Sequence, residues 1–155
     1  MEKGRTGLTY SSIAARAGTI FTMLPSTPQV EAVYLSPTGL LPGLVSSTSE
    51  TLLLDCTTLD PSAAKAVSER VTRETSGRAA MLDCPVSGGT TGASAATLTF
   101  MVGTPNGSKE VFDKALPYLA RMAREGRVIH CGASGAGLGI KICNKSVITT
   151  PDWPY

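Results

Sequence analysis

Two glycine-rich segments carry the residues that could do chemistry in this chain. Residues 83–103 place Ser87-Gly88-Gly89 directly after a strand-like run, and residues 132–145 place Lys141 just after a group of glycines. Glycine backbone can approach a ligand closely and offer it N–H groups, because no Cβ stands in the way. A nearby lysine can bind an anion or move a proton. Together the two segments predict a site for a small-molecule carboxylate.

Each segment also has a plainer interpretation. Ser87-Gly88-Gly89 could be a flexible connection between strands, and Lys141 could be a solvated surface lysine. The position of Lys141 favours chemistry, since it falls one turn into an expected helix whose N-terminus attracts anions and does not favour a lysine. Serine-hydrolase chemistry is not expected for Ser87, because His130 is the only histidine and has no evident acidic partner.

The cysteines predict reduced, buried thiols rather than a metal site. No CxxC occurs, and the spacing of Cys56, Cys84, Cys131 and Cys143 matches no zinc pattern. With one histidine in the chain, a His/Cys metal site has too few ligands. Reduced thiols are typical of an intracellular protein, which is the location we expect.

Short apolar runs alternate with helical patterns along the chain. The runs that predict strands are residues 18–24, 51–56, 79–84, 97–103 and 127–131. Helices are expected after Thr27-Pro28, after Asp60-Pro61 and ending at Gly77, over residues 107–122, and from within residues 135–143. Residues 36–43 and the connection before residue 97 are expected to be loops.

The resulting order, β-α-β-α-β-β-α-β-α, predicts an α/β fold with a doubly wound, mostly parallel sheet covered on both faces. One antiparallel or edge pairing is expected, because no helix is predicted between the third and fourth strands. The nucleotide-binding turn GxGxxG of such folds is not complete. Gly135 and Gly137 supply its first two positions, but Ile140 stands at the third. No Walker A motif is present either.

Composition excludes several classes of function. The chain has 155 residues, 42% hydrophobic and 17% charged, which suits one globular domain. A net charge of +2 without a basic block, and only three Phe, four Tyr and one Trp, argue against a nucleic-acid partner. No apolar run approaches the ~20 residues of a membrane span, so no membrane partner is expected. The first residues lack the apolar core of a secretory signal.

Several motifs jointly resemble the β-hydroxyacid dehydrogenase family, and its 3-hydroxyisobutyrate dehydrogenase branch most closely. Residues 83–89, DCPVSGG, are similar to the family's substrate signature D-x-P-V-S-G-G. Residues 98–103 (LTFMVG) and 141–144 (KICN) resemble that branch in particular. Upstream, residues 22–25 (TMLP) and 55–61 (DCTTLDP) resemble the cofactor side of the family's site. The resemblance covers residues 13–144.

What the resemblance implies is NAD-dependent oxidation of 3-hydroxyisobutyrate, a small hydroxyacid, to methylmalonate semialdehyde in valine breakdown, with NADP as the other candidate cofactor. Lys141 would be the general acid/base on the substrate hydroxyl. Substrate would be held by Ser87, Gly88, Gly89 and Asn144, and cofactor by Leu24, Pro25, Gln29 and Thr58. Family members would place the protein in the mitochondrial matrix of a eukaryote, or otherwise in the cytoplasm.

The chain also departs from the family pattern. The family's opening strand and GxGxxG turn, and its C-terminal helical domain, have no counterpart in the printed residues. We therefore expect a partial Rossmann-like domain that lacks its first βαβ unit. Its expected parts are an irregular N-terminus (1–12), the partial NAD(P)-binding domain (13–134) and the start of an inter-domain helix with an aberrant tail (135–155).

Two substitutions fall inside the motifs themselves. The family's Asn, four residues after the lysine, is Lys145 here, and Asn144 is one position short and about 100° away around a helix. Ala96 replaces a glycine that is usual in the substrate loop.

Two rival hypotheses follow from these departures. The first is an inactive fragment or pseudoenzyme that acts as an association module, because missing strands would leave an unpaired sheet edge that could make a homo-oligomer. A clean monomer in size-exclusion chromatography would count against it. The second is a sister enzyme such as a tartronate semialdehyde reductase. We expect the isolated chain to bind NAD weakly, and micromolar affinity in calorimetry would overturn that expectation.

Overall fold

The computed structural model describes residues 9–149, with side chains described for residues 9–144. The strands are β1 Thr19–Thr22, β2 Thr51–Asp55, β3 Ala79–Asp83, β4 Val86–Ser87, β5 Leu98–Thr104 and β6 Ala123–Ala133. The helices are α1 Tyr10–Ala14, α2 Thr27–Leu35, α3 Leu40–Ser46, α4 Pro61–Glu74, α5 Gly89–Ser94, α6 Lys109–Leu119 and α7 Ala136–Thr149, with a 3₁₀ turn η1 at Pro105–Gly107.

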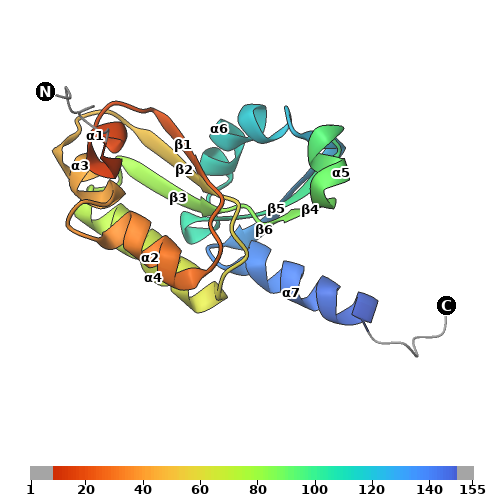
Figure 1. The fold of residues 1–155 in the computed structure, drawn as a ribbon. Helices are drawn as coiled ribbons and strands as arrows, with labels where there is room; N and C mark the ends of the chain where they lie inside the picture. The colour runs from red at the N-terminus through yellow and green to blue at the C-terminus, as the bar shows by residue number, and fades with distance from the viewer. Residues whose placement is uncertain (1–8, 150–155) are drawn as a thin grey trace, which may run out of the picture.

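The six strands form one mixed sheet, which confirms the predicted α/β class and its mostly parallel pairing. β1, β2 and β3 pair in parallel, as do β5 and β6. β5 runs antiparallel to β4, and it meets β3 only through the pair Asp83 and Gly103. The chain therefore reverses direction between β3 and β5. The sheet thus has two halves, the parallel strands β1–β3 and the mixed strands β4–β6, which meet near the carboxyl end of β3 (Figure 1).

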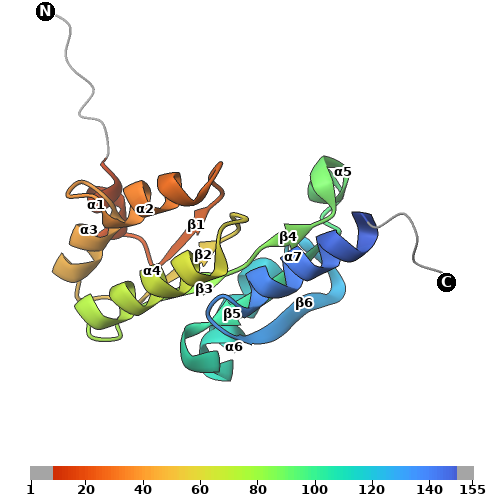
Figure 2. The same cartoon turned by 90° about the horizontal axis from the view of Figure 1, so that it is seen from below.

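Helices cover both faces of this sheet. α2, α3, α4 and α7 lie on one side, and α6 lies on the other (Figures 1 and 2). The core on the first side is built around Val30, Tyr34, Leu53, Val67 and Leu138. A second core joins both halves of the sheet to α6, with Leu54, Leu82, Phe100, Phe112 and Leu119 at its centre. Among residues 9–149, no helix has both the length and the apolar character that crossing a membrane requires.

Two segments in the first half of the chain differ from the sequence-based expectation. Residues 40–46, expected to be a loop, form α3, because Leu40, Leu41 and Leu44 are buried in the first core. Its Gly43 lets α1 approach so closely that a Cβ there would lie 2.0 Å from the Ser11 carbonyl oxygen. Residues 10–12, expected to be irregular, belong to α1. Tertiary packing thus stabilises helices that carry little periodic signal of their own.

The connection between β3 and β5 was expected to contain no helix, and this was wrong. It contains β4 and the six-residue helix α5, whose sequence GTTGAS has no apolar periodicity. The tail from Lys145 was expected not to continue the lysine helix, yet the backbone of α7 continues to Thr149. The side chain of Lys145 and all of residues 150–155 lie outside the described residues.

The start of α4 shows how local sequence fixes an element. Asp60 lies before the helix, and its carboxylate accepts hydrogen bonds from the backbone N–H groups of Ser62 (2.9 Å) and Ala63 (3.0 Å). Pro61 occupies the first helical position, where no N–H is needed. Gly77, after the last turn, adopts φ 78°. These residues are the predicted start and stop signals of the helix. α4 connects β2 to β3, which pair side by side in the sheet.

Asp60→Ala is expected to lower the midpoint of thermal unfolding by roughly 2 to 4 °C, because α4 loses its N-cap. Hydrogen bonds from Ser62 and Ala63 lower the pKa of Asp60. The stabilisation is therefore present at neutral pH and is lost as pH falls through that lowered value. Differential scanning calorimetry measures the shift. Ser26→Ala is the control, since Ser26 precedes α2 but makes no side-chain capping bond. Equal shifts in the two variants would contradict the assignment.

Candidate functional site

A pocket of about 820 Å³ lies where the two halves of the sheet meet. Its walls come from the end of β1, from Cys56 after β2, from β4 and α5, from β5 and from α7. The lining residues are Phe21, Thr22, Met23, Cys56, Val86, Ser87, Gly88, Gly89, Thr90, Ala93, Leu98, Phe100, Met122 and Lys141. The pocket thus unites the two glycine-rich segments from which the carboxylate site was predicted.

Lys141 reaches this pocket from the second turn of α7. Its side chain is half-buried, and its Nζ donates a hydrogen bond of 2.6 Å to the backbone carbonyl oxygen of Val86. Val86 immediately precedes Ser87, so the ammonium group stands beside the segment that was predicted to hold a carboxylate. The arrangement places a cation and proton carrier next to a loop of small residues.

The Ser87-Gly88-Gly89 segment needs its glycines for backbone reasons. Gly88 adopts φ 135° and Gly89 φ 60°, conformations that residues with a Cβ rarely adopt. A Cβ on Gly88 would also lie 3.0 Å from the side chain of Leu98. Ser87 is half-buried at the end of β4, whereas both glycines are exposed. The loop therefore presents one hydroxyl and bare backbone to the pocket.

The residues predicted for the cofactor side lie at the carboxyl ends of β1 and β2, beyond the pocket lining. The backbone N–H of Leu24 donates a 2.9 Å hydrogen bond to the Thr57 hydroxyl, which ties the two strand ends together. Pro25, Gln29 and Thr58 are exposed on this edge, and Gln29 accepts a hydrogen bond from the Ser26 hydroxyl. Open α/β sheets bind ligands at such strand ends. The role of these residues in cofactor binding stays a prediction.

A buried polar chain supports this edge. The Asp55 side chain is fully buried, and its Oδ1 accepts hydrogen bonds from the Thr22 hydroxyl (3.0 Å) and the Thr57 N–H (3.1 Å). The Thr22 hydroxyl also bonds the phenol of buried Tyr34 at 2.8 Å. Asp55 Oδ2 has no hydrogen-bond partner among the described residues. Burial raises the pKa of Asp55, against the opposing effect of those hydrogen bonds.

Asp55→Asn is expected to stabilise the chain at neutral pH relative to acid. A raised native pKa means that the contribution of Asp55 is fully present below its unfolded pKa and is lost as pH rises through the native value. Asparagine does not ionise and escapes that loss. The gain in unfolding free energy should therefore shrink from about pH 7 to about pH 4. Urea titrations across this range measure it, with exposed Asp113→Asn as the control. A gain that is independent of pH would refute the argument.

Some predicted residues lie outside the pocket. The Asn144 side chain is exposed and is not among the lining residues, so its substrate role stays a prediction.

Cys56 lines the pocket, but burial raises the pKa of its thiol to about 12, which makes it a poor nucleophile at neutral pH. In the part of the chain that the structure describes, no group of three His, Cys, Asp or Glu side chains is placed to hold a metal ion.

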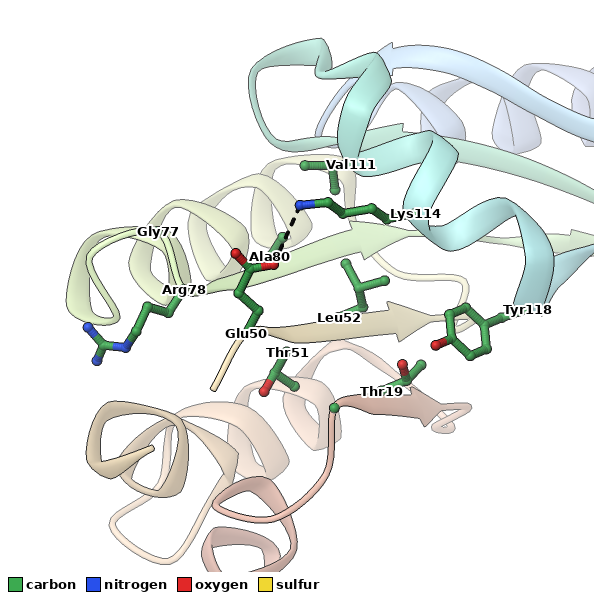
Figure 3. A pocket seen from close by; sticks show the side chains of 11 residues that line it. Thr19, Glu50, Thr51, Leu52, Gly77, Arg78, Ala80, Val111, Lys114 and Tyr118 are labelled. Atoms are coloured by element: carbon green, nitrogen blue, oxygen red, sulfur yellow. Dashed lines mark hydrogen bonds and ion pairs between the residues drawn. The ribbon is translucent and has the colours of Figure 1, made fainter. Parts of the chain in front are cut away.

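A different pocket, of about 330 Å³, opens at the other end of the parallel strands (Figure 3). Lys114 of α6 and Glu50 before β2 form a 3.5 Å ion pair across it. Its wall also includes Leu52 and Tyr118. None of the predicted site residues lines it. It lies at the amino ends of β1, β2 and β3, away from the edge where α/β sheets place their ligands.

Sequence reasoning missed most of the apolar wall of the main pocket. Phe21 and Met23 lie at the end of β1, and Phe100 lies in β5. From the sequence alone, all three are expected to be core residues of strands. Phe21 and Met23 are in fact 44% and 68% exposed, which is unusual for a buried strand. The sequence feature that could have indicated their exposure is their position at the carboxyl end of a parallel strand. Met23 belongs to the TMLP motif there, and Phe21 directly precedes it.

Comparisons with known proteins agree with this architecture. The family described as the NAD binding domain of 6-phosphogluconate dehydrogenase matches residues 2–133. The chain is 42% identical to a probable mitochondrial 3-hydroxyisobutyrate dehydrogenase of Dictyostelium discoideum, over 89% of the chain and 40% of that protein. It is also 42% identical to an NAD-dependent L-serine dehydrogenase of Pseudomonas aeruginosa, over 85% of the chain and 41% of that protein.

A solved structure gives the same result. The 3-hydroxyisobutyrate dehydrogenase of Mycobacterium tuberculosis, with L-serine, superimposes with a TM-score of 0.75 at 37% identity, covering 89% of this chain and 43% of that one. The chain thus spans about two fifths of the length of these relatives. The predicted resemblance and the Rossmann-like fold are confirmed. The chain belongs to the family of the NAD binding domain of 6-phosphogluconate dehydrogenase.

Proposed function

We propose that this chain supplies the substrate-side part of an NAD(P)-dependent dehydrogenase that oxidises a small β-hydroxyacid of the 3-hydroxyisobutyrate type. One observation carries the proposal. The same pocket contains Lys141 and the Ser87–Gly89 segment, which lie more than 50 positions apart in the sequence. The relatives named as 3-hydroxyisobutyrate dehydrogenases support the reaction class.

The chemistry divides between the chain and its cofactor. A bound nicotinamide supplies the acceptor for the hydride that leaves the substrate carbon. Ser87 and the backbone of Gly88 and Gly89 would bind the substrate carboxylate. Lys141 would accept the hydroxyl proton as the C–O bond becomes a carbonyl. Leu24, Pro25, Gln29 and Thr58 would line the cofactor side.

The pocket lining favours an apolar substituent over an ammonium group. Its fourteen residues include no Asp or Glu, and Lys141 is its single charged side chain. The α-ammonium of L-serine would find no anionic partner there, and it would lie near a cation. The methyl group of 3-hydroxyisobutyrate would instead contact the wall that includes Phe21, Met23 and Met122. L-serine remains the second candidate because relatives are named for it or hold it.

We expect 3-hydroxyisobutyrate to give at least a tenfold higher kcat/KM than L-serine, because leaving a charge unpaired in an apolar pocket is costly. Absorbance of the reduced nicotinamide measures turnover with NAD and with NADP. NMR titration of the labelled chain with each acid measures binding without cofactor. Saturable shifts at Ser87–Gly89 and Lys141 are expected for 3-hydroxyisobutyrate. The absence of such shifts with either acid would contradict the proposal. Stronger turnover of L-serine would show that L-serine, and not 3-hydroxyisobutyrate, is the substrate.

The names of the relatives also support a proposal about location. Several of them are named mitochondrial, so we propose the mitochondrial matrix if the chain is eukaryotic and otherwise the cytoplasm. A role in valine breakdown belongs to this proposal as well. Self-association stays a prediction, and size-exclusion chromatography with light scattering tests it.

A further inference from the structure

Asp83 occupies the junction between the substrate loop and the lysine helix. It is the last residue of β3 and only 2% exposed, four positions before Ser87. Its Oδ1 accepts a 2.8 Å hydrogen bond from the backbone N–H of Gly135, and its Oδ2 accepts a 3.2 Å bond from that of Leu138. These N–H groups belong to the entry and first turn of α7, where backbone donors lack partners within the helix. Asp83 therefore caps α7 from a distant part of the chain.

Two glycines make room for this carboxylate. Gly103 is its strand partner, and a Cβ there would lie 2.3 Å from Asp83 Oδ1. On the helix side, a Cβ on Gly137 would lie 2.9 Å from Asp83 Oδ2 and 2.3 Å from the Met101 carbonyl oxygen. The carboxylate is thus enclosed between the backbone of β5 and the backbone of α7. Such close contact fixes both the depth and the rotation of the helix entry.

The electrostatic setting agrees with the geometry. A carboxylate at a helix N-terminus is stabilised by the unpaired N–H groups and by the helix dipole. Burial raises the pKa of Asp83, and backbone hydrogen bonds from Gly135 and Leu138 oppose that shift. The neighbouring Asp55 lies opposite Asp83 in the β2–β3 ladder, yet its carboxylate accepts hydrogen bonds from Thr22 and Thr57. The two buried acids therefore support different walls of the pocket.

The segment of residues 83–87 contacts α7 twice. Asp83 bonds its N-terminus, and the Val86 carbonyl oxygen accepts the hydrogen bond from Lys141 Nζ. Only three helix positions separate Leu138 from Lys141, a rise of about 4.5 Å. We propose that Asp83 is a positioning residue that sets where Lys141 stands relative to the Ser87–Gly89 segment. Its catalytic meaning rests on the proposed function, whereas its effect on α7 does not.

The test compares Asp83→Asn with Asp55→Asn, a matched buried acid in register on the adjacent strand. Asparagine at 83 keeps one acceptor but turns an NH₂ group toward the remaining N–H donor. Hydrogen exchange of residues 135–141 should become at least about tenfold faster in Asp83→Asn, because a charge-assisted bond is lost. Asp55→Asn should leave that segment unchanged. Equal exchange in the two variants would overturn the inference.

Activity gives a second, separable readout. Asp83→Asn should lower kcat more than it raises KM, and should have little further effect in a Lys141→Ala background, because it acts through that lysine. An additive loss in the double variant would overturn the positioning role. If the native chain shows no turnover or acid binding while the exchange result holds, the proposed function fails and the effect of Asp83 on α7 stands.

A measurement on the native chain covers the case in which Asp83→Asn does not fold. First-turn amides of a helix normally exchange freely, since they have no intrahelical acceptor. The Gly135 and Leu138 amides should instead be protected by at least tenfold relative to an unstructured peptide. Exchange at the unprotected rate would overturn the inference without any substitution.

Discussion

Lys141→Ala is expected to lower kcat for 3-hydroxyisobutyrate by about 10²- to 10⁴-fold, the range in which a positioned general acid/base contributes. Lys141 is the single ionisable amine among the residues that line the main pocket, and no histidine lines it. Without the amine, the hydroxyl proton has no acceptor of suitable strength in the pocket. Steady-state kinetics across a pH series measure the loss.

Two comparisons make this result specific. Lys65→Ala removes an exposed lysine on α4 whose ammonium lies 3.9 Å from Glu69, and it should leave kcat unchanged. Small alkylamines added to Lys141→Ala should restore part of the activity, because they can enter the space that the side chain leaves. Retention of most of the native kcat by Lys141→Ala would remove this lysine from the mechanism.

Gly137→Ala is expected to destabilise the fold by about 1 to 3 kcal/mol or more, because overpacking at a rigid contact forces the backbone to shift. Its added Cβ would lie 2.3 Å from the Met101 carbonyl oxygen, which is backbone and cannot rotate away. The same atom would press on the Asp83 carboxylate. Urea denaturation monitored by circular dichroism measures the change.

Gly139→Ala, two residues further along α7, is the matched control. Apart from its own residue, its chain neighbours and the backbone of α7, no heavy atom lies within 4 Å of the position its Cβ would take. Alanine is favoured over glycine inside a helix by roughly 0.5 to 1 kcal/mol, so this variant should be stabilised. Two neighbouring glycines of one helix should thus respond with opposite signs. Changes of the same sign would contradict the close packing of α7 on β5.

The sequence predicts those parts of the fold that local chemistry determines. α4 illustrates this, since Asp60, Pro61 and Gly77 act within their own turns and fix both of its ends. β2 and β3 were equally accessible, because each is an uninterrupted apolar run bounded by polar residues.

What the sequence does not predict is determined by contacts between distant segments. α3 forms because Leu40, Leu41 and Leu44 pack in the first core, and no local sequence pattern predicts that contact. The role of Asp83 depends on Gly103 and Gly137, which lie 20 and 54 positions away. Lys141 and Ser87 can be predicted as site residues only because each stands beside a cluster of glycines, which is visible in the sequence. The apolar residues of the pocket walls have no comparable feature in the sequence.

The single residue pair that joins β3 to β5 lies between the two sets of residues that line the pocket. Phe21 and Met23 belong to one half of the sheet, while Ser87 and Lys141 belong to the other. This one pair is the whole ladder between β3 and β5, and the packing of Leu54, Leu82 and Phe100 in the second core holds the halves together beside it. A substitution at Asp83 or Gly103 can therefore change how Phe21 and Met23 face Ser87 and Lys141 without altering any residue that lines the pocket.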